Sequence, residues 1–308
     1  MRHRNYETTH LAGILMSPWH DLVYHALSHL RVPADDASSL HSDAYSTWCR
    51  EHLEAAGLRS GAVPRTLLLD APLLGELYAR SPQGFLLHAW PLLWDGIPGF
   101  LAEAGRDLAE LSWPTPGRAA LAAAIQENTA PPLPELFRTA LWSELANGYE
   151  DAWRQVVAPR GDAYRGEFLG ILGELAQCLP ELHSFEWVLC HPLRRHGRLL
   201  ECPGERSLVV VGVADAELGV PSMHPVLQGC HEAFVRRARL ASPGEAPWAT
   251  VPGRPGHGAF AAVERAALGM GARFFLGSPW EGAYLDWLGF FFPGKAPAEA
   301  AARLAAGT

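Results

Sequence analysis

The sequence predicts an α+β protein in which a mostly helical N-terminal half packs on a small mixed α/β sheet layer in the C-terminal half. Helical periodicity interrupted by Pro-rich turns runs through about residue 182, and alternating or β-branched runs of strand length follow it. The chain therefore divides into a predominantly helical region, 1–182, and a mixed α/β region, 183–308, which can also form one continuous domain.

Helices are expected throughout the first region. The segment 17–31 opens with Ser17-Pro18, an N-cap followed by a proline in the first turn, and it ends before Pro33. A second helix is expected to start at Asp36 or Ser38 and to end at Gly57. Further helices are expected over 71–79, 100–111, 118–127, 133–157 and 166–179.

Strands are expected only in the second region. The segment 185–190 alternates apolar and other residues, and 207–213 is a β-branched run. Shorter strands are expected over 199–202 and 271–277, helices over 225–240 and 260–268, and a frayed Ala-rich helix from Ala296.

Composition excludes several classes of protein. The chain has 308 residues, 48% hydrophobic and 19% charged, which is typical of a globular protein with a sizeable core. Its formal net charge of -8 argues against a nucleic-acid partner, because phosphate contacts need clustered Lys and Arg. Apolar runs stop well short of the ~20 residues that a membrane helix needs. Five cysteines without a CxxC pair, and no signal-peptide pattern, predict a cytoplasmic protein with reduced thiols.

The first candidate site lies on the helix 17–31. Asp21, His25 and His29 follow one another at intervals of four, which aligns them along one face. His25 and His29 have the ligand spacing of the HExxH zinc-protease helix, but Ala26 replaces its glutamate. Asp21 would orient His25 through a hydrogen bond. Histidines bonded to neighbouring backbone explain the pattern equally well.

The second candidate site lies on the helix 225–240. His224, Gln228, His231 and Glu232 share one face, and the segment follows a strand through a loop, the usual place for a ligand crevice. Here Val235 stands where an HExxH helix has its second histidine. A metal would satisfy His231 and Glu232 together, and so would an ion pair with an arginine.

Together these faces predict a metal-dependent enzyme, in the hydrolase class, with its site between the two helices. His25, His29 and His231 would bind a divalent metal, with zinc preferred over iron or manganese, and leave a position open for water. Glu232 or Asp21 would transfer protons. Three further side chains, Arg194, Arg195 and His224, would bind the substrate, a small molecule or peptide.

Two alternatives compete with this hypothesis. One is a non-catalytic binding or assembly protein with an apolar pocket, and the other is a zinc-protease-like fold that has lost its activity. The chain has 11 Trp, and the aromatic segment 287–292 suggests a partner or a second copy of the chain. A cysteine hydrolase is the weaker enzyme hypothesis, because Cys190 and His191 would face opposite sides of one strand.

Overall fold

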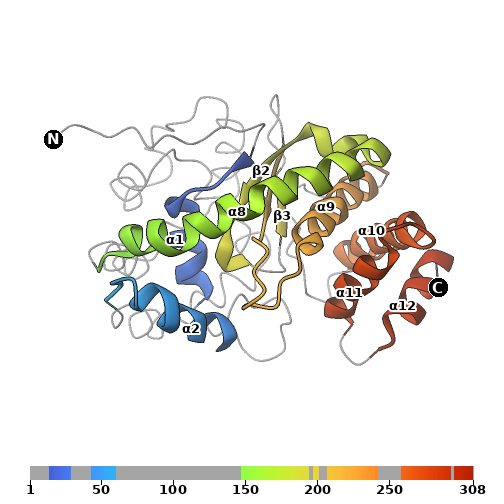
Figure 1. Ribbon diagram of the computed structural model, residues 1–308. Helices are drawn as coiled ribbons and strands as arrows, with labels where there is room; N and C mark the ends of the chain where they lie inside the picture. The colour runs from blue at the N-terminus through green and yellow to red at the C-terminus, as the bar shows by residue number, and fades with distance from the viewer. Residues whose placement is uncertain are drawn as a thin grey trace.

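The computed structural model describes residues 14–28, 43–59, 147–193, 197–200, 207–241, 258–292 and 295–307. This part of the chain is mostly helical (Figure 1), with the helices α1 (Pro18–Ser28), α2 (Asp43–Cys49), α8 (Tyr149–Cys178), α9 (Met223–Ala241), α10 (Gly258–Phe275), α11 (Glu281–Phe291) and α12 (Pro297–Ala306). The strands are β1 (Ile14–Leu15), β2 (Phe185–Leu189), β3 (Gly197–Leu200) and β4 (Ser207–Val211), and the short helical turns are η1 (Arg50–Glu54), η5 (Pro180–Ser184) and η6 (His191–Leu193).

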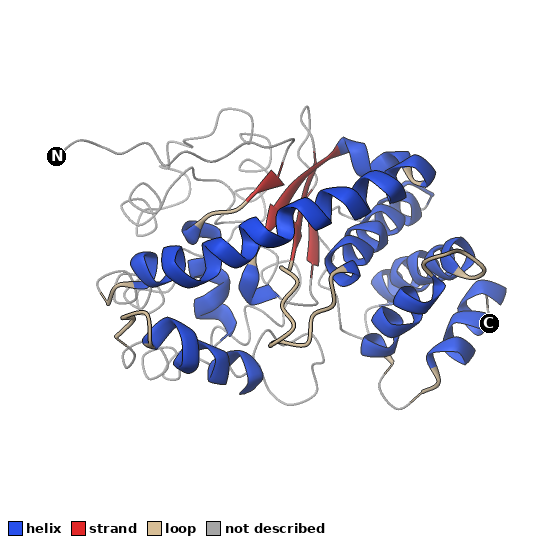
Figure 2. Ribbon diagram, in the orientation of Figure 1, coloured by secondary structure: helices blue, strands red, loops and turns tan. Residues whose placement is uncertain are grey.

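The four strands form one small sheet in the order β1-β2-β4-β3. The first three are parallel, with Ile14 beside Trp187 and Trp187 beside Val209, whereas β3 runs antiparallel to β4. Figure 2 shows this sheet enclosed among the helices. Its parallel part places the carboxyl ends of β1, β2 and β4 at one edge.

Helices α8 and α9 cover the same face of the sheet. The ring of Trp187 on β2 lies edge-on to Phe168 of α8, with ring centroids 5.3 Å apart. On α9, Gly229 lies so close to the same indole that a Cβ at this position would come within 2.1 Å of it. Both helices therefore dock on one tryptophan, and α9 requires a glycine there because no side chain fits.

The long helix α8 differs from the prediction of two helices with a break between residues 157 and 166. Its 30 residues run unbroken through Pro159. The prediction of one helix over 133–157 is also wrong at residues 147 and 148, since α8 begins only at Tyr149, after Gly148 with φ 93°. Buried residues recur every three or four positions along α8, so packing holds the helix together across the proline.

The strand expected over 271–277 is wrong, because residues up to Phe275 belong to α10. The buried positions Val263, Ala267, Ala272 and Phe275 have helical spacing, and α10 packs on α9 and α12. The paired phenylalanines that suggested a strand lie at the helix end, where Phe234 of α9 packs against both. The Ala-rich tail is the helix α12, with Ala301 fully buried.

The predicted combination of helices with a small mixed sheet is confirmed in this part of the chain. Strands β2, β3 and β4 and helices α1 and α9 appear within a few residues of their predicted positions. The helix predicted from Asp36 or Ser38 to Gly57 is represented by α2 and η1, which together cover 43–54, and its residues 36–42 lie outside the described part. β1 was not expected, and it brings the first region of the chain into the sheet. The helices expected over 71–79, 100–111 and 118–127 lie outside the described residues. No helix in the described part is long and apolar enough to cross a membrane.

Candidate functional site

Polar side chains gather at the carboxyl ends of the three parallel strands. Asp21 lies on α1, the helix after β1. Cys190 and His191 follow β2 directly, and Asp215 and Glu217 follow β4. Figure 1 shows α1 and α2 lying beside one end of α8 near this edge of the sheet. In α/β proteins this edge is the common location of a binding crevice.

Asp21 is fully buried and binds three donors. The indole of Trp153 donates to Oδ2 at 2.7 Å, the backbone N–H of His191 donates to Oδ1 at 3.2 Å, and the Cys190 thiol is the third donor. Burial raises the pKa of the Asp21 carboxyl to about 7, against the opposing effect of these hydrogen bonds. Asp21 therefore ties α1 to the end of β2, and it does not orient His25 as predicted.

His25 lies one turn further along α1 in an aromatic environment. Its Nδ1 lies 3.0 Å from the hydroxyl of Tyr45 on α2, and its ring packs on Tyr149 with centroids 4.9 Å apart. The Sγ atom of Cys49 lies 3.9 Å from the same nitrogen. These contacts fasten α2 and the start of α8 to α1.

His191 and Asp215 form a buried pair across the ends of β2 and β4. His191 Nε2 lies 2.9 Å from Asp215 Oδ2, and the two side chains are 1% and 4% exposed. Burial lowers the pKa of His191, although Asp215 opposes this effect. Burial alone would raise the pKa of Asp215, but His191, the Glu217 amide and Arg160 together bring it below its ordinary value. The pair therefore consists of a neutral imidazole that donates from Nε2 to a carboxylate.

The other ring nitrogen of His191 is an acceptor in this tautomer. Among the described residues, Nδ1 is buried and has no hydrogen-bond partner. A neutral histidine with one nitrogen held by a carboxylate and the other able to accept a proton is the arrangement of a general base.

The polar face of α9 is used differently. Glu232 accepts hydrogen bonds from Gln228 Nε2 at 2.9 Å and from the Leu199 backbone N–H at 3.1 Å. His231 Nε2 lies 2.8 Å from Glu264 of α10, and His224 Nε2 lies 2.8 Å from Asp286 of α11. Each side chain thus contacts a different neighbour, and the arginine partner envisaged for Glu232 is replaced by a glutamine and a backbone amide.

Two of the predicted metal ligands, His25 and His231, have different neighbours in the described structure. His25 is surrounded by side chains of α2 and α8, whereas His231 contacts Glu264 and the ring of Trp287. Within the described ranges, no group of three or more His, Cys, Asp or Glu side chains is placed to hold a metal ion. His29, Arg194 and Arg195 lie outside those ranges.

Sequence reasoning considered His191 only as a partner of Cys190, and it did not find the pairing of His191 with Asp215. The strand expected over 185–190 ends at Leu189, so His191 lies in the turn beyond it and does not alternate with Cys190 on a strand face. The loop after β4 was recognised as a place for ligands, but Asp215 within it was not singled out. A search for polar residues directly after each predicted strand would have found both.

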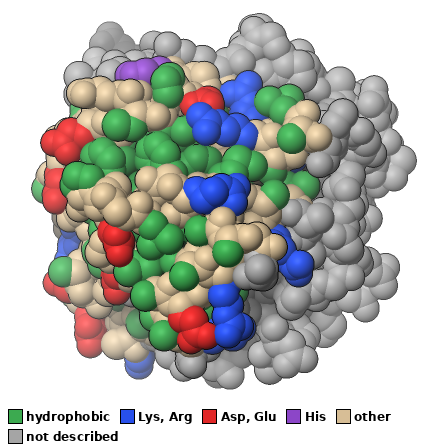
Figure 3. Space-filling model, turned by 90° about the vertical axis from the view of Figure 1, so that its right-hand side faces the viewer, with side chains coloured by type: hydrophobic (Ala, Val, Ile, Leu, Met, Phe, Trp, Pro, Cys, Tyr) green, Lys and Arg blue, Asp and Glu red, His purple; other side chains and the backbone are tan. Residues whose placement is uncertain are grey.

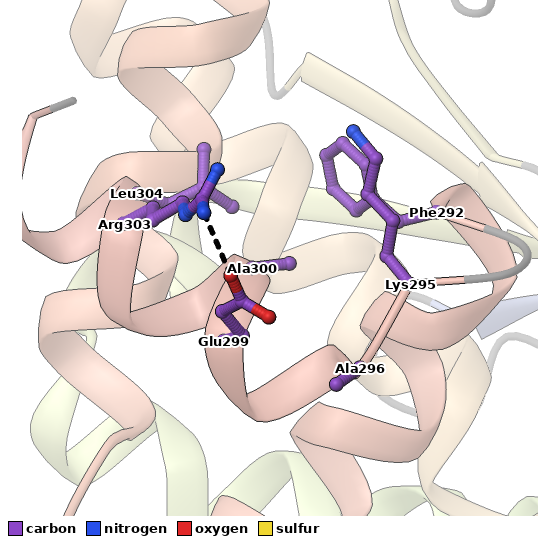
Figure 4. A pocket seen from close by; sticks show the side chains of 7 residues that line it. All are labelled: Phe292, Lys295, Ala296, Glu299, Ala300, Arg303 and Leu304. Carbon is purple, nitrogen blue, oxygen red and sulfur yellow. Dashed lines mark hydrogen bonds and ion pairs between the residues drawn. The ribbon is translucent and has the colours of Figure 1, made fainter.

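A hollow of about 460 Å³ lies elsewhere, along α12 (Figure 4). Phe292, Lys295 and one face of α12 line it, and Glu299 and Arg303, one turn apart on α12, pair with each other at 2.7 Å. Figure 3 shows hydrophobic side chains mixed with charged ones on one face of the molecule. Trp287 and Leu288, from the aromatic segment expected to meet a partner, are buried in the core.

Comparisons with protein-family models, with curated proteins and with solved structures gave no match.

Proposed function

We propose that the protein is a hydrolase that activates water by general base catalysis at the carboxyl ends of β1, β2 and β4. The observation that carries the proposal is the buried His191–Asp215 pair, in which His191 Nδ1 has no partner among the described residues. Nδ1 would accept a proton from water as the water attacks the substrate, and Asp215 would stabilise the imidazolium that forms.

The supporting residues have separate roles. Asp21 positions His191 by accepting its backbone N–H, and Arg160 Nε, 3.5 Å from Asp215 Oδ2, helps to keep Asp215 ionised. Arg194 and Arg195 follow His191 within four positions of the chain. We propose that they bind a carboxylate or phosphate of a small-molecule or peptide substrate.

The test is a panel of chromogenic esters, amides and phosphoesters assayed with wild type, His191→Gln and His231→Gln. Loss of a general base costs about 10²-fold or more in rate, so His191→Gln should lose that much. His231→Gln is the matched control, because it also removes a buried histidine paired with a carboxylate, in this case that of Glu264. Equal hydrolysis by wild type and His191→Gln would contradict the proposal, and a panel with no turnover at all would favour the non-catalytic alternative.

A metal-dependent form of this activity is a second candidate. It rests on His25, whose Nδ1 is held by the Tyr45 hydroxyl, so that Nε2 is the nitrogen that would bind a metal, as in many histidine ligands. His29 would join it on a divalent ion, with zinc preferred. The expected third ligand, His231, would have to leave Glu264 to reach this ion. In this form Glu232 would carry protons and His224 would contact the substrate.

Metal content by mass spectrometry tests this candidate, on protein purified without chelator. Near-stoichiometric metal that disappears in both His25→Ala and His231→Ala would establish a shared site. Loss in His25→Ala alone would exclude His231 as a ligand, and metal-free wild type with full hydrolytic activity would overturn the candidate.

We also propose a cytoplasmic location. Among the described cysteines, Cys49, Cys178, Cys190 and Cys230 are all free thiols, as expected in a reducing compartment. Fractionation of cells that produce the protein, with an export marker as reference, would test this location.

A further inference from the structure

The imidazole of His191 lies beneath a tryptophan from another part of the chain. The Trp48 ring on α2 packs on the His191 ring with centroids 4.4 Å apart, and both side chains are almost fully buried. The guanidinium of Arg160 lies 5.3 Å from the centroid of the same indole, and Tyr45 is stacked parallel to it. A substrate must displace this indole to reach His191 from the side that Trp48 covers.

One carboxylate oxygen holds the indole in place. Glu217 Oε2 accepts from Trp48 Nε1 at 3.1 Å, and it pairs with His52 Nε2 at 2.7 Å and Arg160 Nη2 at 3.3 Å. These partners come from α2, η1 and α8, so Glu217 fastens three elements at once. Its side chain is 53% exposed, and ion pairs at such positions are weak enough to open reversibly.

The same loop carries this carboxylate and the carboxylate of the proposed site. Asp215 Oδ1 accepts the backbone N–H groups of Glu217, at 2.9 Å, and Leu218, at 3.4 Å. Asp215 and Val220 close the loop with two backbone hydrogen bonds. The loop is therefore a rigid unit built on Asp215, and Glu217 projects from it towards Trp48.

We propose that Trp48 is a gate over the His191–Asp215 pair and that Glu217 is the latch that keeps it closed. The gate rests on the proposed function for its purpose, since it regulates access to that site. Its opening is a physical property that can be measured without any substrate.

The experiment measures carbethoxylation of His191 by diethyl pyrocarbonate, quantified by peptide mass spectrometry. His183, exposed and eight residues earlier, is the internal reference. Reaction is kept to low extents, because modification of the part-exposed His52 would itself break the latch. The variants are Glu217→Ala, which removes the latch, and Trp48→Phe, which removes the N–H donor together with the five-membered part of the indole and keeps one six-membered ring. Glu181→Ala, which loses a surface pair with Arg237, is the matched control.

In wild type and Glu181→Ala, His191 should react far more slowly than His183. Glu217→Ala should raise the relative rate at His191 about tenfold or more, because it removes three interactions with a charged group, and Trp48→Phe should raise it less. An unchanged relative rate in both variants, with circular dichroism matching wild type, would overturn the gate, as would a wild-type His191 as reactive as His183. A gate that opens while His191→Gln retains full hydrolysis would refute the proposed function and leave the gate standing.

Discussion

Helices α1 and α9 both carry a polar face of histidines and carboxylates at helical spacing, but the two faces make different kinds of contact. On α1, Asp21 reaches the end of β2 and lies next to the turn that carries His191. On α9, His224, His231 and Glu232 bond separately to α11, α10 and β3. The same sequence pattern thus lies beside a cluster of polar side chains on α1, whereas on α9 each polar side chain bonds to a different element.

The difference comes from the neighbours of each helix. The start of α1 directly follows a strand of the parallel sheet, and the loops after β2 and β4 meet it there. The polar side chains His224, His231 and Glu232 of α9 meet three different elements, α11, α10 and β3, each of which offers one polar partner. A polar face therefore indicates burial against polar partners, and only the position of the helix in the sheet topology separates a site from a set of attachments.

Asp21→Asn should give the largest change in the pH dependence of stability, because it removes a buried group that titrates. Folding raises the pKa of Asp21 from 3.8 to about 7, so its contribution to stability is complete below pH 3.8 and is lost as the pH rises through about 7. At about 1.4 kcal/mol per pKa unit, the difference in unfolding free energy should shift in favour of the variant by up to about 4 kcal/mol between acidic and alkaline pH. Urea unfolding across this range measures the shift, and a pH-independent difference would contradict it.

Glu232→Ala tests the attachments of α9. The substitution leaves the Gln228 amide and the Leu199 N–H without their acceptor in a buried position. We expect a loss of about 3 kcal/mol, at roughly 1–3 kcal/mol for each unsatisfied group, measured by urea unfolding. Glu299→Ala, which removes an exposed pair with Arg303, should change stability by less than about 0.5 kcal/mol. Equal effects of the two substitutions would show that Glu232 does not anchor β3.

His231→Gln should have a smaller effect that depends on pH in a known direction. Burial lowers the pKa of His231, but Glu264 and Glu232 outweigh burial and raise it above 6.5. The stabilisation by the charged pair is therefore complete below pH 6.5 and is lost as the pH rises through the raised pKa. The unfolding free energy of the wild type should exceed that of the variant by about 1.5 kcal/mol at acidic pH, the low end for a hydrogen bond to a charged group, and by less at alkaline pH. Thermal unfolding at both pH values measures this difference in stability, with the exposed His183→Gln as control. A difference that grows as the pH rises would contradict the prediction.

The main strands and helices were predictable because residue type and apolar spacing are local features of the sequence. The β-branched run of β4 and the apolar residues of α9 are examples, although both elements are buried on nearly all sides. Packing decided α8, which continues through Pro159, and α10, which absorbs a strand-like segment. A two-residue strand such as β1 has too little sequence to show a period, and only its pairing with β2 defines it.

Only part of the candidate site could be predicted from the sequence. Asp21 and His25 could be chosen from their spacing, but the roles predicted for them relied on a meeting with α9 that the described structure does not show. His191 and Asp215 are 24 positions apart and share no periodicity. Their partnership arises from the parallel pairing of β2 and β4, which brings the ends of both strands together.

The sequence by itself determined the class of the protein, its helix faces and its main strands, because these depend on the spacing of neighbouring residues along the chain. The tertiary structure alone decided which polar groups meet. Trp48, His191, Asp215 and Glu217 come from distant segments, and they lie together because strand pairing and helix packing close the chain around them. Contacts between residues so far apart depend on the entire fold, and no local pattern encodes them.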